Sequence, residues 1–160
     1  MSKTTASAIE AKLTAMGLTL PPAPAPVANY VPTHVVGNLL FISGQISRDG
    51  AGKILSGKLG AGVTVEQGRE AARVCALNLL AQTRAALGSL DRIARIVKLT
   101  GFVNAAPTFT DHPAVMNGCS DLLVELLGDK GRHTRSAVGV SGLPLDAAVE
   151  VEAIIEIAGA

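Results

Sequence analysis

The predicted strands of this chain carry apolar side chains on both of their faces, and this pattern limits the folds available to it. In residues 39–42 and 96–103, apolar side chains stand at even and odd positions alike. Successive side chains of a strand point to opposite faces, so both faces of this sheet need burial. We predict two long helices, which can cover one face. The other face is expected to pack against a second copy of the chain, unless the short N-terminal helix covers part of it.

The elements follow one another without a regular alternation of strand and helix, which indicates an α+β fold with two long helices on one face of a mixed sheet. A capping box between Thr64 and Gln67 begins the first long helix, and Gly88 and Gly128 end the two long helices. The predicted elements are a short helix at 7–16, a Pro/Ala-rich connector at 20–32, a hairpin that turns at 37–38 and is interrupted at 44–45, a helix at 64–87, a strand at 92–104, a helix from 110–113 to 127, and a closing hairpin at 133–157 that turns at 142–144.

The length and charge of the chain limit its organisation and its partners. Its 160 residues suit one domain, at residues 20–160, preceded by an N-terminal helical extension at 1–19. The net charge of +1 and an aromatic content of 2% argue against nucleic acid as a partner. No apolar run is long enough to span a membrane, and the N-terminus is not a secretory signal. We therefore expect a cytoplasmic protein.

The sequence contains no recognisable motif for a metal or cofactor site. The histidines His34, His112 and His133 show no ligand spacing with cysteines or carboxylates, so we predict no metal. The glycine patterns that bind dinucleotides or the phosphates of nucleotides are absent, so we predict no cofactor. Cys75 and Cys119 fall in predicted helices and are expected to be small buried thiols.

Three charged residues in the last two predicted strands are the candidates for chemistry. Arg135 alternates with apolar and hydroxyl residues, and its own side of the strand is otherwise small, which leaves room for a ligand carboxylate on its planar guanidinium. An edge-strand arginine in solvent explains the same pattern. Glu150 and Glu152 lie on the same face of the last predicted strand. An ordinary solvent-exposed strand face explains this pattern as well.

Several ordered motifs resemble the RidA family, also called the YjgF family. The segment R-S-A-V-G-V-x-x-L-P-x-x-A-x-V-E-V-E-A at 135–153 is similar to its C-terminal signature. The resemblance extends upstream through A-N-Y-V at 28–31, G-N-L-L-F-I-S-G-Q at 37–45, V-K-L-T-G-F-V at 97–103 and the asparagine of M-N at 116–117. The first twenty residues lie outside the usual core of the family, which points to a longer-chain branch.

The resemblance implies a chorismate-mutase-like fold and a homotrimer with clefts between subunits. It implies hydrolysis of 2-imino acids and their enamine tautomers to 2-keto acids and ammonia, without a metal or cofactor. Arg135 would then clamp the substrate carboxylate, and Glu150 would activate water and protonate the leaving nitrogen, with Glu152 as the second candidate. The substrate would also contact Tyr30, the Ser43 and Gly44 backbone, Asn117 and Ala137.

Ala137 stands where many relatives have a cysteine, so a mechanism that needs that thiol is excluded here. Two further functions stay open. The same cleft could hold a small 2-imino or 2-keto acid without turnover, as a binding trimer. Some relatives are described as ribonucleases or translation inhibitors, but the near-zero charge, the scarce aromatics and the lack of a histidine pair for RNA cleavage argue against that activity.

Overall fold

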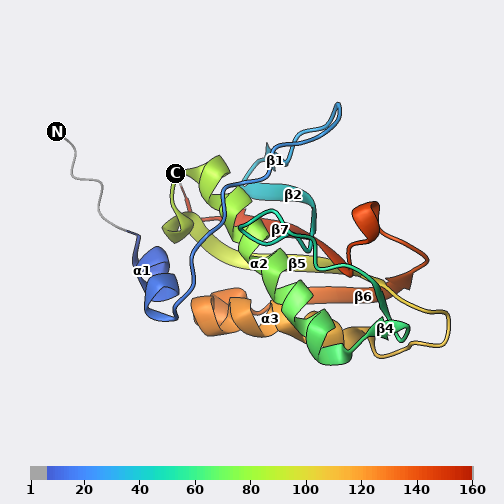
Figure 1. Cartoon of the computed structure of the whole chain (residues 1–160). Helices are drawn as coiled ribbons and strands as arrows, with labels where there is room; N and C mark the ends of the chain where they lie inside the picture. Colours follow the sequence, from blue (N-terminus) through green and yellow to red (C-terminus); the bar gives the residue numbers. More distant parts are fainter. Residues whose placement is uncertain (1–6, 160) are drawn as a thin grey trace.

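A five-stranded sheet with helices on one face forms the body of the protein (Figure 1). The computed structural model describes residues 7–159. The strand order is β1-β2-β7-β5-β6, and every neighbouring pair is antiparallel except β5 and β6. The strands of this sheet are β1 (Thr33–Val36), β2 (Leu39–Ile46), β5 (Ile93–Asn104), β6 (Thr134–Val140) and β7 (Val149–Ile157), and a separate small ladder joins β3 (Lys58–Leu59) to β4 (Gly62–Val63).

The helices begin and end where the sequence predicts. α2 (Val65–Leu87) starts with the capping box between Thr64 and Gln67, and it stops at Gly88, whose φ of 80° is the left-handed conformation that glycine adopts without strain. α3 (His112–Leu127) stops at Gly128. The short helix α1 (Ala8–Ala15) lies within the predicted 7–16, while residues 1–6 of the predicted extension lie outside the described residues.

The predicted closing hairpin is wrong. β6 and β7 do not pair, because β5 lies between them; β6 runs parallel to β5 and is reached through α3. The burial pattern explains this order. Every second residue of β7 is buried, and Val149 and Val151 are fully buried. This burial along the whole strand suits a position at the centre of the sheet. β6 is a seven-residue strand with exposed Thr134 and Ser136, which suits an edge.

The interruption predicted at Gly44-Gln45 is a bulge and not the end of a strand. β2 continues to Ile46, but its register against β7 shifts between Ile42 and Gln45. A bulge bends a strand and re-aims its side chains. The shift lies past the end of the β1 pairing, which covers β2 only from Leu39 to Ile42, so this part of β2 has a free edge.

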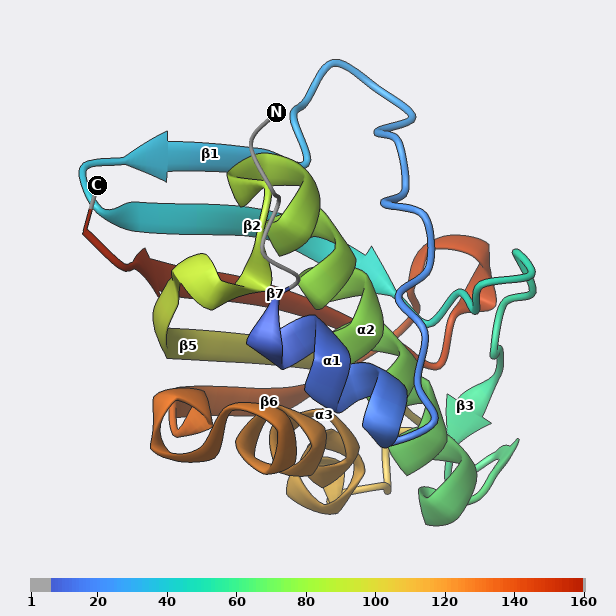
Figure 2. The ribbon, with the colours of Figure 1, turned by 90° about the vertical axis from the view of Figure 1, so that its left-hand side faces the viewer.

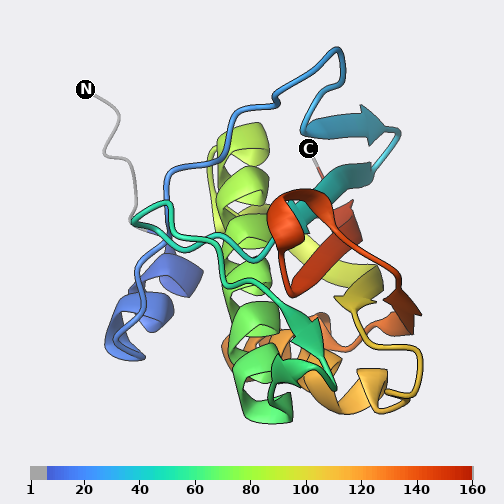
Figure 3. The same ribbon diagram turned by 45° about the vertical axis from the view of Figure 1, so that its right-hand side comes forward.

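α2 and α3 cover one face of the sheet (Figure 3). The hydrophobic core lies between the helices and this face. The other face carries apolar side chains that remain exposed, among them Phe41 (39%) and Val138 (44%). α1 does not cover this face. It packs with Leu13 onto the outer side of the helical layer, beside α2 and α3 (Figure 2).

Among the described residues, the structure contains no helix with both the length and the apolar character needed to cross a membrane.

Candidate functional site

Arg135 lies on the edge strand β6 and faces the helical layer. It pairs in register with Leu99, which is fully buried on that face. Its Nη1 donates to Asn117 Oδ1 and to Ser120 Oγ, both at 3.0 Å, and both acceptors lie on α3, three residues apart on one helix face. Within residues 7–159, Arg135 forms no ion pair with a carboxylate. The guanidinium is therefore oriented by neutral groups while its charge stays uncompensated.

A histidine extends this arrangement. His133 Nδ1 lies 2.6 Å from the Gly131 carbonyl oxygen, which can only accept, so Nδ1 carries the proton. Nε2 lies 2.9 Å from Ser120 Oγ and accepts the hydroxyl proton, which leaves that oxygen free to accept from Arg135. Burial lowers the pKa of His133, and the neighbouring Arg135 charge acts in the same direction, so the ring is neutral near pH 7.

Ala137 follows Arg135 on the same face of β6 and packs against the core. We call Asn117, Ser120, His133, Arg135 and Ala137 the arginine half-site. Sequence reasoning missed Ser120 and the role of His133. The signals that could have found them are spacings: Ser120 is one helical turn after Asn117, and His133 shares its strand parity with Arg135.

Glu150 lies on the opposite face of β7 from Val149 and Val151. Its carboxylate lies over Gly44 at the β2 bulge, where a Cβ atom would collide with Oε1. A side chain at position 44 would therefore push the flexible Glu150 carboxylate out of this position. Burial raises the pKa of the Glu150 carboxyl above its usual value, and the like charge of Glu152 adds to the effect. A raised pKa makes the ionised carboxylate a stronger proton acceptor than an ordinary surface glutamate.

Glu150 lines a cleft with a volume of about 510 Å³. We call it the glutamate cleft. One wall is the connector at residues 24–27 with Tyr30, a second is the bulge at Gly44 and Gln45, and a third is α2 through Asn78 and Gln82. Tyr30 is half exposed at 49%. The cleft therefore follows the free edge of β2, from the sheet face to the helix.

The remaining predicted side chains lie nearby. Ser43 donates from Oγ to the Val31 carbonyl at 2.8 Å, and its backbone N–H donates to the Pro32 carbonyl at 2.9 Å, so it fixes the connector to β2. Glu152 is exposed and faces a different hollow of about 980 Å³, which Lys98, Tyr30 and Ser43 also line. Glu150 and not Glu152 thus has the enclosed setting.

The structure gathers the predicted residues into two groups, not one. Leu99 pairs with Arg135 on one side of β5, and Phe102 pairs with Glu150 on the other. β6 and β7 lie two strand spacings apart across β5, and Leu99 and Phe102 are three residues apart along it. The Cα atoms of Arg135 and Glu150 are therefore roughly 14 Å apart. Their side chains also leave opposite faces of the sheet. One chain therefore does not direct both groups at the same small molecule.

Comparisons with known proteins agree with this architecture. The family model described as "YjgF/chorismate mutase-like, putative endoribonuclease" matches residues 10–157. Protein TCP17 of Trypanosoma cruzi is 47% identical, over 98% of this chain and 99% of its own length. A 2-iminobutanoate/2-iminopropanoate deaminase of Dermatophagoides farinae is 29% identical, over 88% and 94%. The structure of Atu1372 from Agrobacterium tumefaciens, a protein of unknown function, is 46% identical, covers 93% of each chain and superposes with a TM-score of 0.86. The chain therefore belongs to the YjgF family, also called RidA, and has its chorismate-mutase-like fold.

Proposed function

We propose that the protein hydrolyses reactive 2-imino acids, and their enamine tautomers, to 2-keto acids and ammonia. The observation that carries the proposal is a pair of complementary groups: the oriented, uncompensated guanidinium of Arg135 and the shielded carboxyl of Glu150 with its raised pKa. A 2-imino acid has both features that such a pair would handle, a carboxylate and an adjacent electrophilic C=N carbon. The similarity to the mite deaminase supports the same reaction.

We propose that the working site forms between two subunits of a homotrimer. The support is geometric, because Arg135 and Glu150 leave opposite faces of one sheet, so one chain does not bring these two groups together. The uncovered sheet face carries exposed Phe41 and Val138, which a second copy would bury. In such an assembly the arginine half-site of one subunit faces the glutamate cleft of its neighbour.

The proposed reaction follows from the chemistry of these groups. Arg135 binds the substrate carboxylate through two charge-assisted hydrogen bonds, and Asn117 and Ser120 hold the guanidinium in place. Glu150 accepts a proton from water as the oxygen attacks the imine carbon. Glu150 returns this proton to the imine nitrogen, which gives a neutral carbinolamine. The carbinolamine hydroxyl then gives its proton to Glu150 as the C=O bond forms, and Glu150 passes that proton to the amino nitrogen as the C–N bond breaks, so that ammonia leaves. Imino acid and water are consumed, and keto acid and ammonia are released.

Substitution of Arg135 by alanine tests the proposal. An amino-acid oxidase generates the imine in solution, and the rate of ammonia or keto-acid release is followed with and without the protein. We expect wild-type protein to accelerate release and the Arg135→Ala variant to lose roughly 10- to 150-fold in kcat/KM, the equivalent of one charged hydrogen-bond contact. Unchanged acceleration by the variant would reject the proposal. Tight binding of a keto acid without any turnover would replace it with a carboxylate-binding role.

A further inference from the structure

The N-terminal segment forms a wall of the glutamate cleft. We call residues 17–32, between α1 and β1, the strap; it runs alongside α2 (Figures 1 and 2). Residues 24–27 of the strap line the cleft with apolar atoms of two prolines, an alanine and a valine. Its prolines restrict the backbone and keep the strap extended. The strap is therefore a stiff apolar surface, and its position sets the width of the cleft.

Two buried amides connect the strap to the bulge below Glu150. Gln82 of α2, 3% exposed, donates from Nε2 to the Pro24 carbonyl at 2.7 Å and to Gln45 Oε1 at 3.5 Å. Gln45 donates in turn to the Ser43 carbonyl at 2.9 Å. Because both amides are buried, the loss of a partner would leave a polar group unsatisfied. Gln82 thereby fixes the distance between the strap and the part of β2 that carries Gly44.

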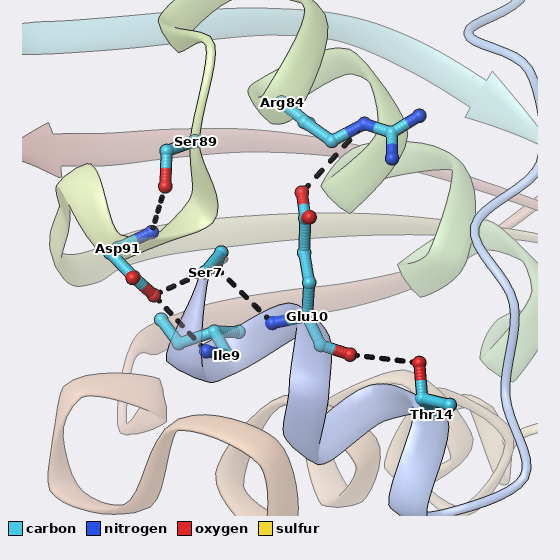
Figure 4. A network of polar contacts seen from close by, with 7 residues as sticks. All are labelled: Ser7, Ile9, Glu10, Thr14, Arg84, Ser89 and Asp91. Carbon is cyan, nitrogen blue, oxygen red and sulfur yellow. Dashed lines mark hydrogen bonds and ion pairs between the residues drawn. The ribbon is translucent and has the colours of Figure 1, made fainter. Parts of the chain in front are cut away.

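The strap is also held at its start, through α1. The Asp91 carboxylate accepts from Ser7 Oγ at 2.8 Å and from Ile9 N at 3.0 Å (Figure 4). It also accepts from Ala8 N at 2.9 Å, so it satisfies N–H groups that a helix start leaves free. These bonds lower the pKa of Asp91, that from Ile9 most. Leu13, 2% exposed, completes the anchor in the core.

The far side of the cleft is apolar and fixed too. Pro144 and Leu145 line it, and Leu145 adopts a φ of 56°, a strained conformation for a branched side chain. Asn104 holds this turn by donating to Asp146 Oδ1 at 3.0 Å and to the Ala147 carbonyl at 3.1 Å. Two restrained apolar walls, the strap and the Pro144-Leu145 turn, thus line the same cleft as Glu150.

We propose that these walls form a side-chain pocket and that the protein prefers 2-imino acids with apolar side chains larger than methyl. The inference rests on the proposed function, because it assumes that the imine reacts beside Glu150. Gln82 is a positioning residue: it holds the strap and does not touch the substrate. α1 acts one step further away, as the anchor of the strap.

The test compares imines made by an amino-acid oxidase from alanine and from leucine. The leucine product has three more carbon atoms to bury, and we expect its kcat/KM with wild-type protein to be roughly tenfold higher. The Gln82→Met variant keeps the length of the side chain and removes its amide. We expect this ratio to fall at least about fivefold, mainly through a higher KM for the leucine product. Asp91→Ala should lower the ratio in the same direction by a smaller factor.

Thr83→Val is the matched control. Thr83 is equally buried on α2, but its hydroxyl donates only within the helix, to the Leu79 carbonyl, so the variant should keep the wild-type ratio. Circular dichroism and melting temperature confirm that each variant folds. A wild-type preference for the alanine product, or an equal loss for both substrates in Gln82→Met, would overturn the inference.

The failure of the proposed function has a different result. If no imine is hydrolysed by wild-type protein, the pocket is tested by the binding of two stable keto acids, pyruvate and 4-methyl-2-oxopentanoate. If wild-type protein binds the larger acid more tightly and the Gln82→Met variant loses this preference, the side-chain pocket is supported even though the protein has no catalytic activity. Equal binding of both acids overturns it.

Discussion

Two variants that are each strongly impaired alone should regain activity when their subunits are mixed. Arg135→Ala removes the proposed carboxylate clamp, and Glu150→Gln removes the proposed proton acceptor, so each uniform protein would lack one half of every proposed site. Arg135 and Glu150 leave opposite faces of the sheet, roughly 14 Å apart at their Cα atoms. If one site takes its arginine from one subunit and its glutamate from the next, a mixed assembly contains some sites with both groups intact.

The expected recovery follows from counting. In a cyclic assembly formed at random from equal amounts of the two variants, a site is intact when its glutamate comes from an Arg135→Ala chain and its arginine from a Glu150→Gln chain. This combination occurs in about one quarter of the sites. The mixture should therefore show about one quarter of the activity of the wild type, and the fraction should follow the product of the two subunit fractions as the ratio changes.

The assay unfolds the variants together in denaturant, refolds them, and measures ammonia release from oxidase-generated imines. Variants that are refolded separately and then combined are the control, because their subunits have not been exchanged. A double variant, Arg135→Ala with Glu150→Gln, mixed with wild type gives the complementary control, since it contributes no usable half. Activity of the co-refolded mixture no higher than that of the separate proteins would show that each chain carries a complete site, and the reasoning from sheet faces would be refuted.

Three further changes have defined outcomes. Because burial raises the folded-state pKa of Glu150 above its unfolded value, its contribution to stability is fully present below about pH 4 and is lost as pH rises through the folded pKa. Denaturant unfolding should therefore find Glu150→Gln more stable than wild type at pH 7, with the difference vanishing near pH 4; a constant difference would contradict this. Gly44→Ala should displace the Glu150 carboxylate and lower kcat while the fold persists by circular dichroism, and full activity would show that the contact is dispensable. Ser120→Ala should raise KM several-fold more than it lowers kcat, because the Arg135 guanidinium loses one of its two neutral partners, and an effect on kcat alone would argue against the positioning role.

The sequence predicts the local features of this fold well. The capping box at Thr64, the stops at Gly88 and Gly128 and the turn at Gly37-Asn38 depend on short-range hydrogen bonds and backbone preferences, which neighbouring residues determine. The two-sided apolar pattern of the strands also correctly indicated a sheet with one face left uncovered by its long helices.

Strand pairing is where the local reasoning failed. Two β-like segments separated by a Gly-Leu-Pro turn favour a hairpin, but which strand lies next to β7 depends on the insertion of β5, far away in the chain. The same limit applies to the site. Arg135 and Glu150 could be chosen from the sequence, but only the order of the strands shows that they leave opposite faces. The Gln82–Pro24 bond, across 58 positions, has no local signal either.

The role of the first helix was open in the sequence, and its packing now limits the choices. It could have covered the free sheet face, but Asp91 and Leu13 hold it on the outer side of the helices. The free face therefore stays uncovered by α1, and the proposed influence of α1 on the glutamate cleft would pass through the strap.

The most direct test of a shared site is a crystal structure of the assembled protein with a bound 2-keto acid. We predict that the ligand carboxylate lies on Arg135 of one subunit, while its keto carbon lies within reach of Glu150 from the neighbouring subunit. A ligand held by Arg135 with no glutamate of another subunit beside it, or a keto acid in the glutamate cleft whose carboxylate contacts Arg48 or no arginine at all, would contradict the account.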